Sequence, residues 1–362
     1  MPADPTSSEQ RDALVERLFA AALGVNDLYL VHIGDRLGLY RALGSEGSMT
    51  SSELAAATGT QERYVREWLE HQAVGGLLEV ADEGDALSRS YALPDGHAEV
   101  LLDRESEAYL APFARMMVGI VRPLDQVLDA FRTGAGVAYA EYPADFCEGQ
   151  GEMNRVSFVH GLAGWLGEMP EEDARLRSDP PARVADVACG TGFSTLEIAR
   201  AYPKVTVDGL DLDPASIAVA RANLEASGLA DRVTFSRRDA ADPGLSGRYD
   251  LVCVFEAIHD LSRPVEVLAS LRGLLADGGS VLVADERVAD SFTAPGDDVE
   301  RLMYGWSVLH CLPVGMAEQP SAATGTAMRA DTLRAYALDA GFTVVDVLPI
   351  EHEFWRFYRL GP

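Results

Sequence analysis

The residues with the clearest chemical potential lie at the ends of short apolar runs in the middle of the sequence. Residues 186–192 read DVACGTG, and Asp211 ends a second apolar run 21 residues after Gly190. Glycines let the backbone approach a ligand at the carboxyl end of a strand, and a following helix N-terminus favours a negatively charged group. A carboxylate at Asp211 can accept hydrogen bonds from both hydroxyls of a ribose. The loop and the acid together therefore predict a site for a nucleotide-like cofactor.

Two classes of cofactor fit this arrangement. A dinucleotide requires G-x-G-x-x-G or A, but the sixth position is Thr195 when counted from Gly190 and Phe193 when counted from Ala188. S-adenosylmethionine has no phosphate, needs a less complete glycine pattern, and carries a sulfonium cation that an acidic pocket favours. The sequence therefore favours S-adenosylmethionine over NAD.

The elements that must position these residues alternate between strand and helix. Short strands are expected at 183–188, 205–210, 232–236, 249–255 and 280–285. Helices are expected near 195–202, 214–227 and 264–275. This alternation predicts a parallel sheet with helices on both faces, and two final apolar segments predict an antiparallel hairpin at its edge. The expected fold class is α/β, with a doubly wound Rossmann-like domain at the C-terminal end.

The N-terminal part has a different pattern. Thr50 precedes a short helix that stops at Gly59, a second helix covers residues 61–74, and short strands follow around residues 77–80 and 91–93. A helix, a turn, a helix and a two-stranded ribbon predict a mainly helical winged-helix domain. Residues 99–170 are expected to be mostly helical. Two prolines in RLRSDPPAR then indicate the main boundary.

These features together resemble the class I S-adenosylmethionine-dependent methyltransferases. The loop DVACGTG is similar to the family's acidic-x-G-x-G-x-G motif, with Ala188 replacing the first glycine, a change that fits if the φ angle of Ala188 is negative. The whole chain resembles bacterial winged-helix-fused small-molecule O-methyltransferases, in which the winged helix dimerises. The resemblance implies a homodimer with a dimerisation domain at 1–98, a helical linker or substrate lid at 99–175, and a cofactor-binding domain at 176–362.

The resemblance assigns the cofactor-binding residues by position. Asp211 would bind the ribose and Leu212 would pack on the adenine, while Asp239 and Ala240 would recognise the adenine amino group. The end of the fourth strand would meet the methionyl group and the acceptor. The residues expected to bind S-adenosylmethionine are Asp186, Ala188, Gly190, Gly192, Asp211, Leu212, Asp239, Ala240, Phe255 and Glu256.

The pair His259-Asp260 resembles the His-Asp pair of plant-type O-methyltransferases, in which the histidine takes the proton of the acceptor hydroxyl. Histidine titrates near neutrality, and a nearby carboxylate can raise its basicity. Asp285 lies where those enzymes hold a supporting glutamate, although no acid occupies the position of the second one, near Ala327 and Met328. The expected catalytic residues are His259, Asp260 and Asp285; the alternative that His259 only packs stays open.

The acceptor is expected to be a small molecule. The fourth strand ends in FEAI instead of the D/N-P-P-Y/F motif of nucleic-acid base methylation, and without HxH or HExxH motifs we expect no metal site. Aromatic and apolar residues on either side of the glycine loop could line an acceptor pocket or belong to the core. They are Phe146, Met153, Phe158, Trp165, Tyr304, Trp306 and His310.

Composition limits the partners and the compartment. The chain has 362 residues with 30 basic and 57 acidic side chains, a net charge of −27 that opposes non-specific binding to nucleic acid or anionic lipid. Neither a signal-peptide pattern nor a long apolar run is found, so a cytoplasmic location is expected. Methyl transfer from S-adenosylmethionine to a hydroxyl group is the expected function. The alternatives are a ligand-responsive winged-helix transcriptional regulator that uses the methyltransferase fold as a sensor, or an NAD-type oxidoreductase.

Overall fold

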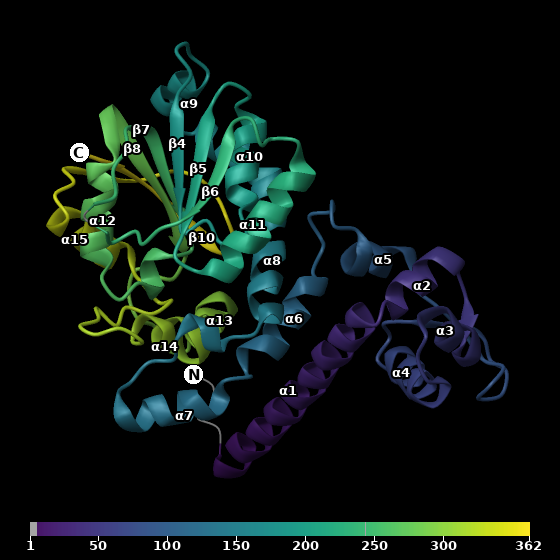
Figure 1. Ribbon diagram of the computed structural model, residues 1–362. Coiled ribbons are helices and arrows are strands. Elements are labelled where there is room, and N and C mark those ends of the chain that lie inside the picture. The colour runs from purple at the N-terminus through teal and green to yellow at the C-terminus, as the bar shows by residue number, and fades with distance from the viewer. Residues whose placement is uncertain (1–5, 243) are drawn as a thin grey trace. The chain divides into compact units, whose positions relative to one another are not determined.

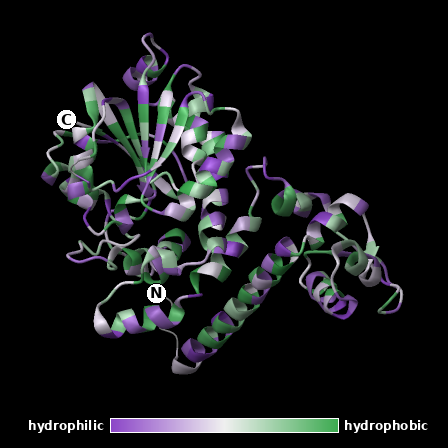
Figure 2. Ribbon diagram, in the orientation of Figure 1, coloured by the Kyte–Doolittle hydropathy of each residue, from purple (hydrophilic) through white to green (hydrophobic). Residues whose placement is uncertain are grey.

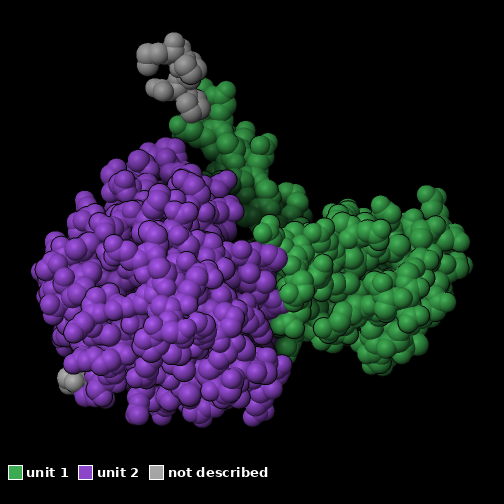
Figure 3. Space-filling model, turned by 90° about the horizontal axis from the view of Figure 1, so that it is seen from above, with its two compact units in different colours: residues 1–119 green, residues 120–362 purple. Residues whose placement is uncertain are grey.

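The computed structural model describes residues 6–242 and 244–362 and divides the chain into two compact units, which span residues 1–119 and 120–362 (Figure 3). The segment 99–175, expected as a linker or lid, is therefore shared between the two units. Across the described residues, no helix combines the length and the apolar character that a bilayer crossing would need.

The first unit contains the predicted helix-turn-helix and its strands. Its elements are α1 (Ser7–Arg36), α2 (Leu39–Glu46), β1 (Met49–Thr50), α3 (Ser51–Thr58), α4 (Glu62–Val74), β2 (Glu79–Asp82), β3 (Ser90–Ala92), α5 (Asp95–Leu102) and α6 (Ala111–Ile120), the last of which ends at the boundary. The strands form one antiparallel sheet in the order β1-β3-β2. The winged-helix prediction is confirmed, with a third strand of two residues that no sequence pattern indicated.

The start of the helix-turn-helix follows from local chemistry. The Thr50 hydroxyl accepts a hydrogen bond from the Glu53 backbone N–H, while the Glu53 carboxylate accepts one from the Thr50 backbone N–H at 2.8 Å. This reciprocal cap fixes the first turn of α3. Gly59 ends the helix with a φ angle of +66°, a conformation that glycine adopts without steric cost.

The second unit is built on a seven-stranded sheet in the order β6-β5-β4-β7-β8-β10-β9 (Figure 1). Its strands are β4 (Arg183–Val187), β5 (Thr206–Asp211), β6 (Val233–Arg237), β7 (Tyr249–Phe255), β8 (Leu275–Glu286), β9 (Val344–Val347) and β10 (Trp355–Gly361). The first five strands run parallel, and β10 pairs antiparallel with both β8 and β9. The doubly wound sheet with a terminal hairpin at its edge is thus confirmed.

The helices of the second unit include those that cover both faces of this sheet. They are α7 (Leu124–Thr133), η1 (Tyr139–Glu141), α8 (Ala144–Gly167), α9 (Pro170–Leu176), α10 (Phe193–Ala201), α11 (Pro214–Ser227), η2 (Ile258–Asp260), α12 (Pro264–Gly273), α13 (Asp298–Trp306), the π-helix η3 (Ser307–Cys311), α14 (Leu312–Gly315) and α15 (Ala330–Asp339). Alternate residues of each strand point to opposite faces. Val184 accordingly packs in one core with α8 and α10, and Ala185 packs in the other with α12 and α15.

The strand order decides where a ligand can bind. The chain enters the sheet at β4, proceeds outward through β5 and β6, and returns to the other side of β4 as β7. Ligands of such sheets bind outside the carboxyl ends of the strands, where the order reverses. In this sheet that point lies between β4 and β7.

Candidate functional site

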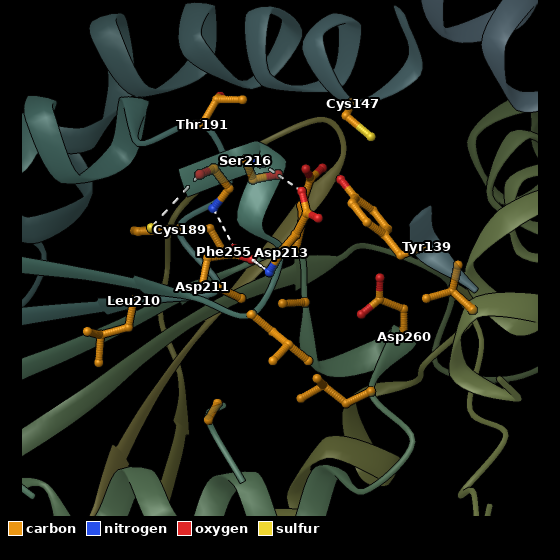
Figure 4. A pocket seen from close by; sticks show the side chains of 18 of the residues that line it. Tyr139, Cys147, Cys189, Thr191, Leu210, Asp211, Asp213, Ser216, Phe255 and Asp260 are labelled. Carbon is orange, nitrogen blue, oxygen red and sulfur yellow. Dashed lines mark hydrogen bonds between the residues drawn. The ribbon is translucent and has the colours of Figure 1, made fainter. Parts of the chain in front are cut away.

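A pocket of about 560 Å³ lies at this point, at the carboxyl ends of β4, β5, β6 and β7 (Figure 4). Ten of the residues expected to form the site line it: Phe158, Ala188, Gly190, Asp211, Leu212, Asp239, Ala240, Phe255, Glu256 and Asp260. The other expected residues lie outside its lining: Phe146, Met153, Trp165, Asp186, Gly192, His259, Asp285, Tyr304, Trp306 and His310. The tertiary structure therefore brings most of the expected cofactor-binding set together.

Side-chain hydrogen bonds connect the segment that carries the glycine loop to the first turn of α10. The Asp186 carboxylate is buried and accepts hydrogen bonds from the hydroxyls of Ser194 (2.6 Å) and Thr195 (2.5 Å). Burial raises the pKa of Asp186 to about 6, against these hydrogen bonds, which lower it. Gly192 has a φ angle of +84°, and a Cβ atom there would lie 2.5 Å from the Phe235 ring. Asp186 and Gly192 thus shape the loop from behind the pocket.

Ala188 departs from the expected backbone. Its φ angle is +57°, in the left-handed region, whereas the sequence reasoning required a negative value. The expectation was wrong because the turn after β4 needs this conformation whichever residue occupies it. An L-residue there carries a steric cost of about 1–2 kcal/mol that glycine avoids.

We expect Ala188→Gly to stabilise the protein by about 0.5–1 kcal/mol, because relief of the left-handed strain exceeds the extra chain entropy of glycine in the unfolded state. Thermal or urea unfolding measures the change. The matched control is Ala222→Gly at an exposed position of α11, where the same substitution should destabilise the protein by about 0.5–1 kcal/mol. If Ala188→Gly and Ala222→Gly destabilised the protein equally, the proposed backbone strain at Ala188 would be contradicted.

Asp211 is held rigidly at the end of β5. Its Oδ2 accepts a hydrogen bond from the Gly190 backbone N–H and its Oδ1 accepts one from the Asp213 backbone N–H, both at 2.8 Å. Burial raises the pKa of Asp211, while these backbone donors act in the opposite direction. The carboxylate thereby links the glycine loop to its own strand and faces the pocket (Figure 4). Its remaining lone pairs suit the hydroxyls of a ribose.

Glu256 is anchored on both oxygens at the end of β7. The Trp355 indole Nε1–H donates to Oε1 at 2.5 Å, and the Asn154 side-chain amide donates to Oε2. Glu256 has a φ angle of +49°, a second strained position in the wall of the pocket. Backbone strain of this kind persists only where the surroundings determine it, and it clusters at functional sites.

The partner of His259 is Asp285. The His259 Nδ1 and the Asp285 Oδ1 are 2.7 Å apart, and both side chains are buried. Burial by itself lowers the pKa of His259, but the Asp285 carboxylate, together with Cys311, raises it well above the usual value. Of the two acids expected beside His259, Asp285 therefore orients the ring, whereas Asp260 lines the pocket.

Most of the aromatic candidates lie in packed interiors. Trp165 packs with Trp355 and Phe357, at ring-centroid distances of 5.5 and 4.9 Å, and Phe146 contacts the His310 ring at 4.5 Å. Burial lowers the pKa of His310 to about 3, so its imidazole is neutral at physiological pH.

Several lining residues were missed by the sequence reasoning. On α8, Cys147, Gly151 and Asn154 line the pocket together with Phe158, at the helical spacing of three and four residues. That periodicity, counted backward from Phe158, was the available signal. Tyr139 on η1 also faces the pocket, and no motif surrounds it. Among the described residues, no group of three or more His, Cys, Asp or Glu side chains is placed to hold a metal ion.

Family models match both parts of the chain. Residues 184–279 match the model described as a methyltransferase domain, and residues 23–103 match that of an Rv2258c-like winged HTH domain. The curated relatives include malonyl-[acyl-carrier protein] O-methyltransferase of Halalkalibacterium halodurans, 28% identical over 33% of this chain, and 3-hydroxy-5-methyl-1-naphthoate 3-O-methyltransferase of Streptomyces sahachiroi, 33% identical over 32%. The matches span 45% and 34% of those two proteins, less than half of either length.

Solved structures share the fold over nearly the whole length. Mitomycin 7-O-methyltransferase superposes with a TM-score of 0.69 at 20% identity, covering 98% of this chain and 99% of that one. Human N-acetylserotonin methyltransferase, solved in complex with S-adenosylmethionine, gives a TM-score of 0.64 at 16% identity and covers all of both chains. At these identities the likeness establishes the fold of both units.

Proposed function

We propose that this chain, in which a class I S-adenosylmethionine-dependent methyltransferase domain follows an N-terminal winged helix-turn-helix domain, transfers a methyl group from S-adenosylmethionine to a hydroxyl group of a small-molecule acceptor. One observation carries the proposal. A single pocket collects, in the order of the strands, Asp239 after β6, Asp211 at the end of β5, the glycine loop after β4, and Glu256 after β7.

The side chains present fit this cofactor. Asp211 can bind the ribose hydroxyls, Leu212 offers an apolar surface that is half exposed, and Asp239 lies next along the wall for the adenine. Gly190 has a φ angle of +52°, and a Cβ atom there would meet nothing within 4 Å, so the loop leaves room for a ligand. The bound cofactor would supply a methyl group made electrophilic by a positive sulfur. Acids facing the pocket favour that charge.

The size and lining of the pocket support a small acceptor. The volume of about 560 Å³ has to hold the cofactor as well as the acceptor, and Phe158, Val314 and Ala317 give the pocket an apolar wall beside polar groups. The chain's own contribution to the reaction would be to hold the acceptor oxygen in line with the methyl group and to exclude water. Such positioning supplies most of the rate enhancement in a displacement of this kind.

We further propose His259 as the group that receives the acceptor proton. The Asp285 hydrogen bond to Nδ1 supports this role, because it keeps the proton on that nitrogen and raises the basicity of the ring, to which the Cys311 thiol is also hydrogen-bonded. His259 does not line the pocket itself, but the next residue of η2, Asp260, does.

The proposal is tested by incubating the protein with S-adenosylmethionine and a panel of phenols and other hydroxylated small molecules, and measuring S-adenosylhomocysteine by mass spectrometry. Formation of S-adenosylhomocysteine together with an O-methylated product is expected. Binding of NAD in a fluorescence titration, without binding of S-adenosylmethionine, would favour an oxidoreductase. Cofactor binding without turnover, combined with tight duplex binding in a gel shift, would favour a regulator.

The partner of the first unit is proposed to be a second copy of the chain. Only three of the 30 residues of α1 are buried, and large apolar side chains recur along it (Figure 2). Leu14, Leu18 and Phe19 are 54%, 62% and 66% exposed. Large apolar side chains left exposed along one helix are typical of an interaction site.

We expect Leu18→Glu combined with Phe19→Glu to convert a dimer into a monomer. The dimer would have to bury two carboxylates at an apolar interface, and the free energy required exceeds the favourable free energy of the contact. Light scattering coupled to gel filtration measures the mass. The control, Leu87→Glu, changes an exposed residue of the same unit outside α1 and should leave the mass unchanged. A wild-type protein that is monomeric at micromolar concentration would contradict the dimer.

A further inference from the structure

The ends of β7 and β8 bring four carboxyl groups and one imidazole together. Glu256 and Asp260 line the pocket, while Asp285 and Glu286, the last residues of β8, are buried behind it beside His259. If all four acids were ionised, the charge of one imidazolium would leave three negative charges uncompensated. Burial makes such charge costly, so part of the cluster must hold protons.

Asp260 is the member of this cluster best placed to exchange its proton with the pocket. Its side chain is half-buried and directed into the cavity (Figure 4). Burial, assisted by the nearby carboxylates, raises the pKa of Asp260 to about 7, and His259 opposes the rise. The titratable groups that act on Asp260 or respond to it are Asp211, Glu256, His259, Asp285, Glu286 and Cys311.

The order of the strands places Asp260 toward one end of the proposed cofactor site. Asp239 follows β6, Asp211 ends β5, and the glycine loop separates both from η2, which follows β7. A cofactor with its adenine at Asp239 and its ribose at Asp211 would carry its sulfur toward the β7 side. This step rests on the proposed function.

We infer that Asp260 is partly protonated in the free protein at neutral pH and releases that proton to solvent when the sulfonium cation of S-adenosylmethionine binds, so that the pocket prefers the charged methyl donor over the neutral product. The carboxylate formed in this way compensates the sulfonium charge. After methyl transfer that charge is gone, the carboxylate regains a proton, and the pocket loses its attraction for S-adenosylhomocysteine. Asp260 is thus a residue that determines specificity between donor and product.

Calorimetry with the two ligands tests this linkage without an acceptor. Titrations in two buffers of different ionisation enthalpy give the number of protons released on binding. S-adenosylhomocysteine has the same titratable groups as the donor and lacks only the methyl group and the fixed positive charge of the sulfonium, so the difference between the ligands isolates that charge. Because a neighbouring cation lowers the pKa of a carboxyl by roughly 1–3 units, we expect S-adenosylmethionine to release about half a proton more at pH 7 and almost none extra at pH 8. Its affinity relative to S-adenosylhomocysteine should rise roughly 5- to 10-fold from pH 6 to pH 8.

Two variants test whether Asp260 is the group that releases the extra proton. Asp260→Asn should abolish both the extra proton and the pH dependence of the affinity ratio, while its binding of S-adenosylhomocysteine shows that the pocket is folded. Glu353→Gln removes an exposed carboxyl of the same unit outside the lining of the pocket and should retain both effects. Equal proton release for the two ligands in the wild type, or an unchanged difference in Asp260→Asn, would overturn the inference. If the wild type binds neither ligand, the proposed function fails instead.

Discussion

Replacing His259 with alanine is expected to lower the rate of methyl transfer by about 10²–10⁴-fold and to leave the affinity for S-adenosylmethionine nearly unchanged. The reason is that a hydroxyl group becomes a strong nucleophile only as its proton leaves, and a positioned base takes that proton in the transition state. Turnover with the best acceptor from the panel measures the rate, and calorimetry measures the affinity. A change in cofactor affinity that accounts for the whole rate loss would instead indicate a packing role.

The pH profile gives an independent check. A base must be unprotonated to act, so activity should fall as the pH decreases through the pKa of His259. Since Asp285 helps to raise that pKa, this acidic limb of the pH profile should lie at a higher pH than the usual pKa of a histidine. The limb should be missing in His259→Ala. Asp285→Asn keeps the shape of the partner but removes its charge, and should move the limb to lower pH. Near-normal turnover of His259→Ala would remove His259 from the mechanism, and methyl transfer would then rest on positioning of the acceptor alone.

The second large effect is expected at Asp211. Asp211→Ala removes the carboxylate proposed to bind both ribose hydroxyls, and hydrogen bonds to a charged group contribute about 1.5–3 kcal/mol each. Cofactor affinity should therefore fall at least 10-fold. The variant also leaves the backbone N–H groups of Gly190 and Asp213 without their acceptor, so thermal unfolding must show that the protein is still folded at the assay temperature.

The choice of ligand separates this role from that of Asp260. The ribose is common to S-adenosylmethionine and S-adenosylhomocysteine, so Asp211→Ala should weaken both ligands by the same factor. Asp260→Asn should weaken the charged ligand selectively. Unchanged calorimetric affinity in a folded Asp211→Ala would refute the assignment of Asp211 to the ribose.

Much of the catalytic domain could be predicted because its signals are local in the chain. Apolar runs of strand length, separated by capped helices, specify a parallel sheet and show where each strand ends. Asp211 and Asp239 could be placed in the site because the carboxyl ends of parallel strands meet at one edge of a sheet. The structure confirms the strand order that this reasoning requires.

The helix-turn-helix was predictable for the same reason. Its cap at Thr50 and its stop at Gly59 act within one or two turns of chain. The exposed apolar residues of α1, such as Leu14 and Leu18, recur at helical spacing in the sequence, but this spacing does not indicate what covers them. Burial inside the chain and contact with a second copy produce the same spacing of apolar residues.

Only the tertiary structure decided which side chains meet across long stretches of sequence. Asp260 is adjacent to His259 in the chain, yet the acid that bonds its ring is Asp285, 26 residues away, because β7 and β8 are neighbouring strands and end side by side. The left-handed backbone of Ala188 was also invisible, since residue type gives a preference and the turn imposes the angle. Sequence thus determined the strand ends and the acids that follow them. Packing between strands determined which acids face the pocket and which serve the histidine behind it, because those contacts depend on the register of the folded sheet.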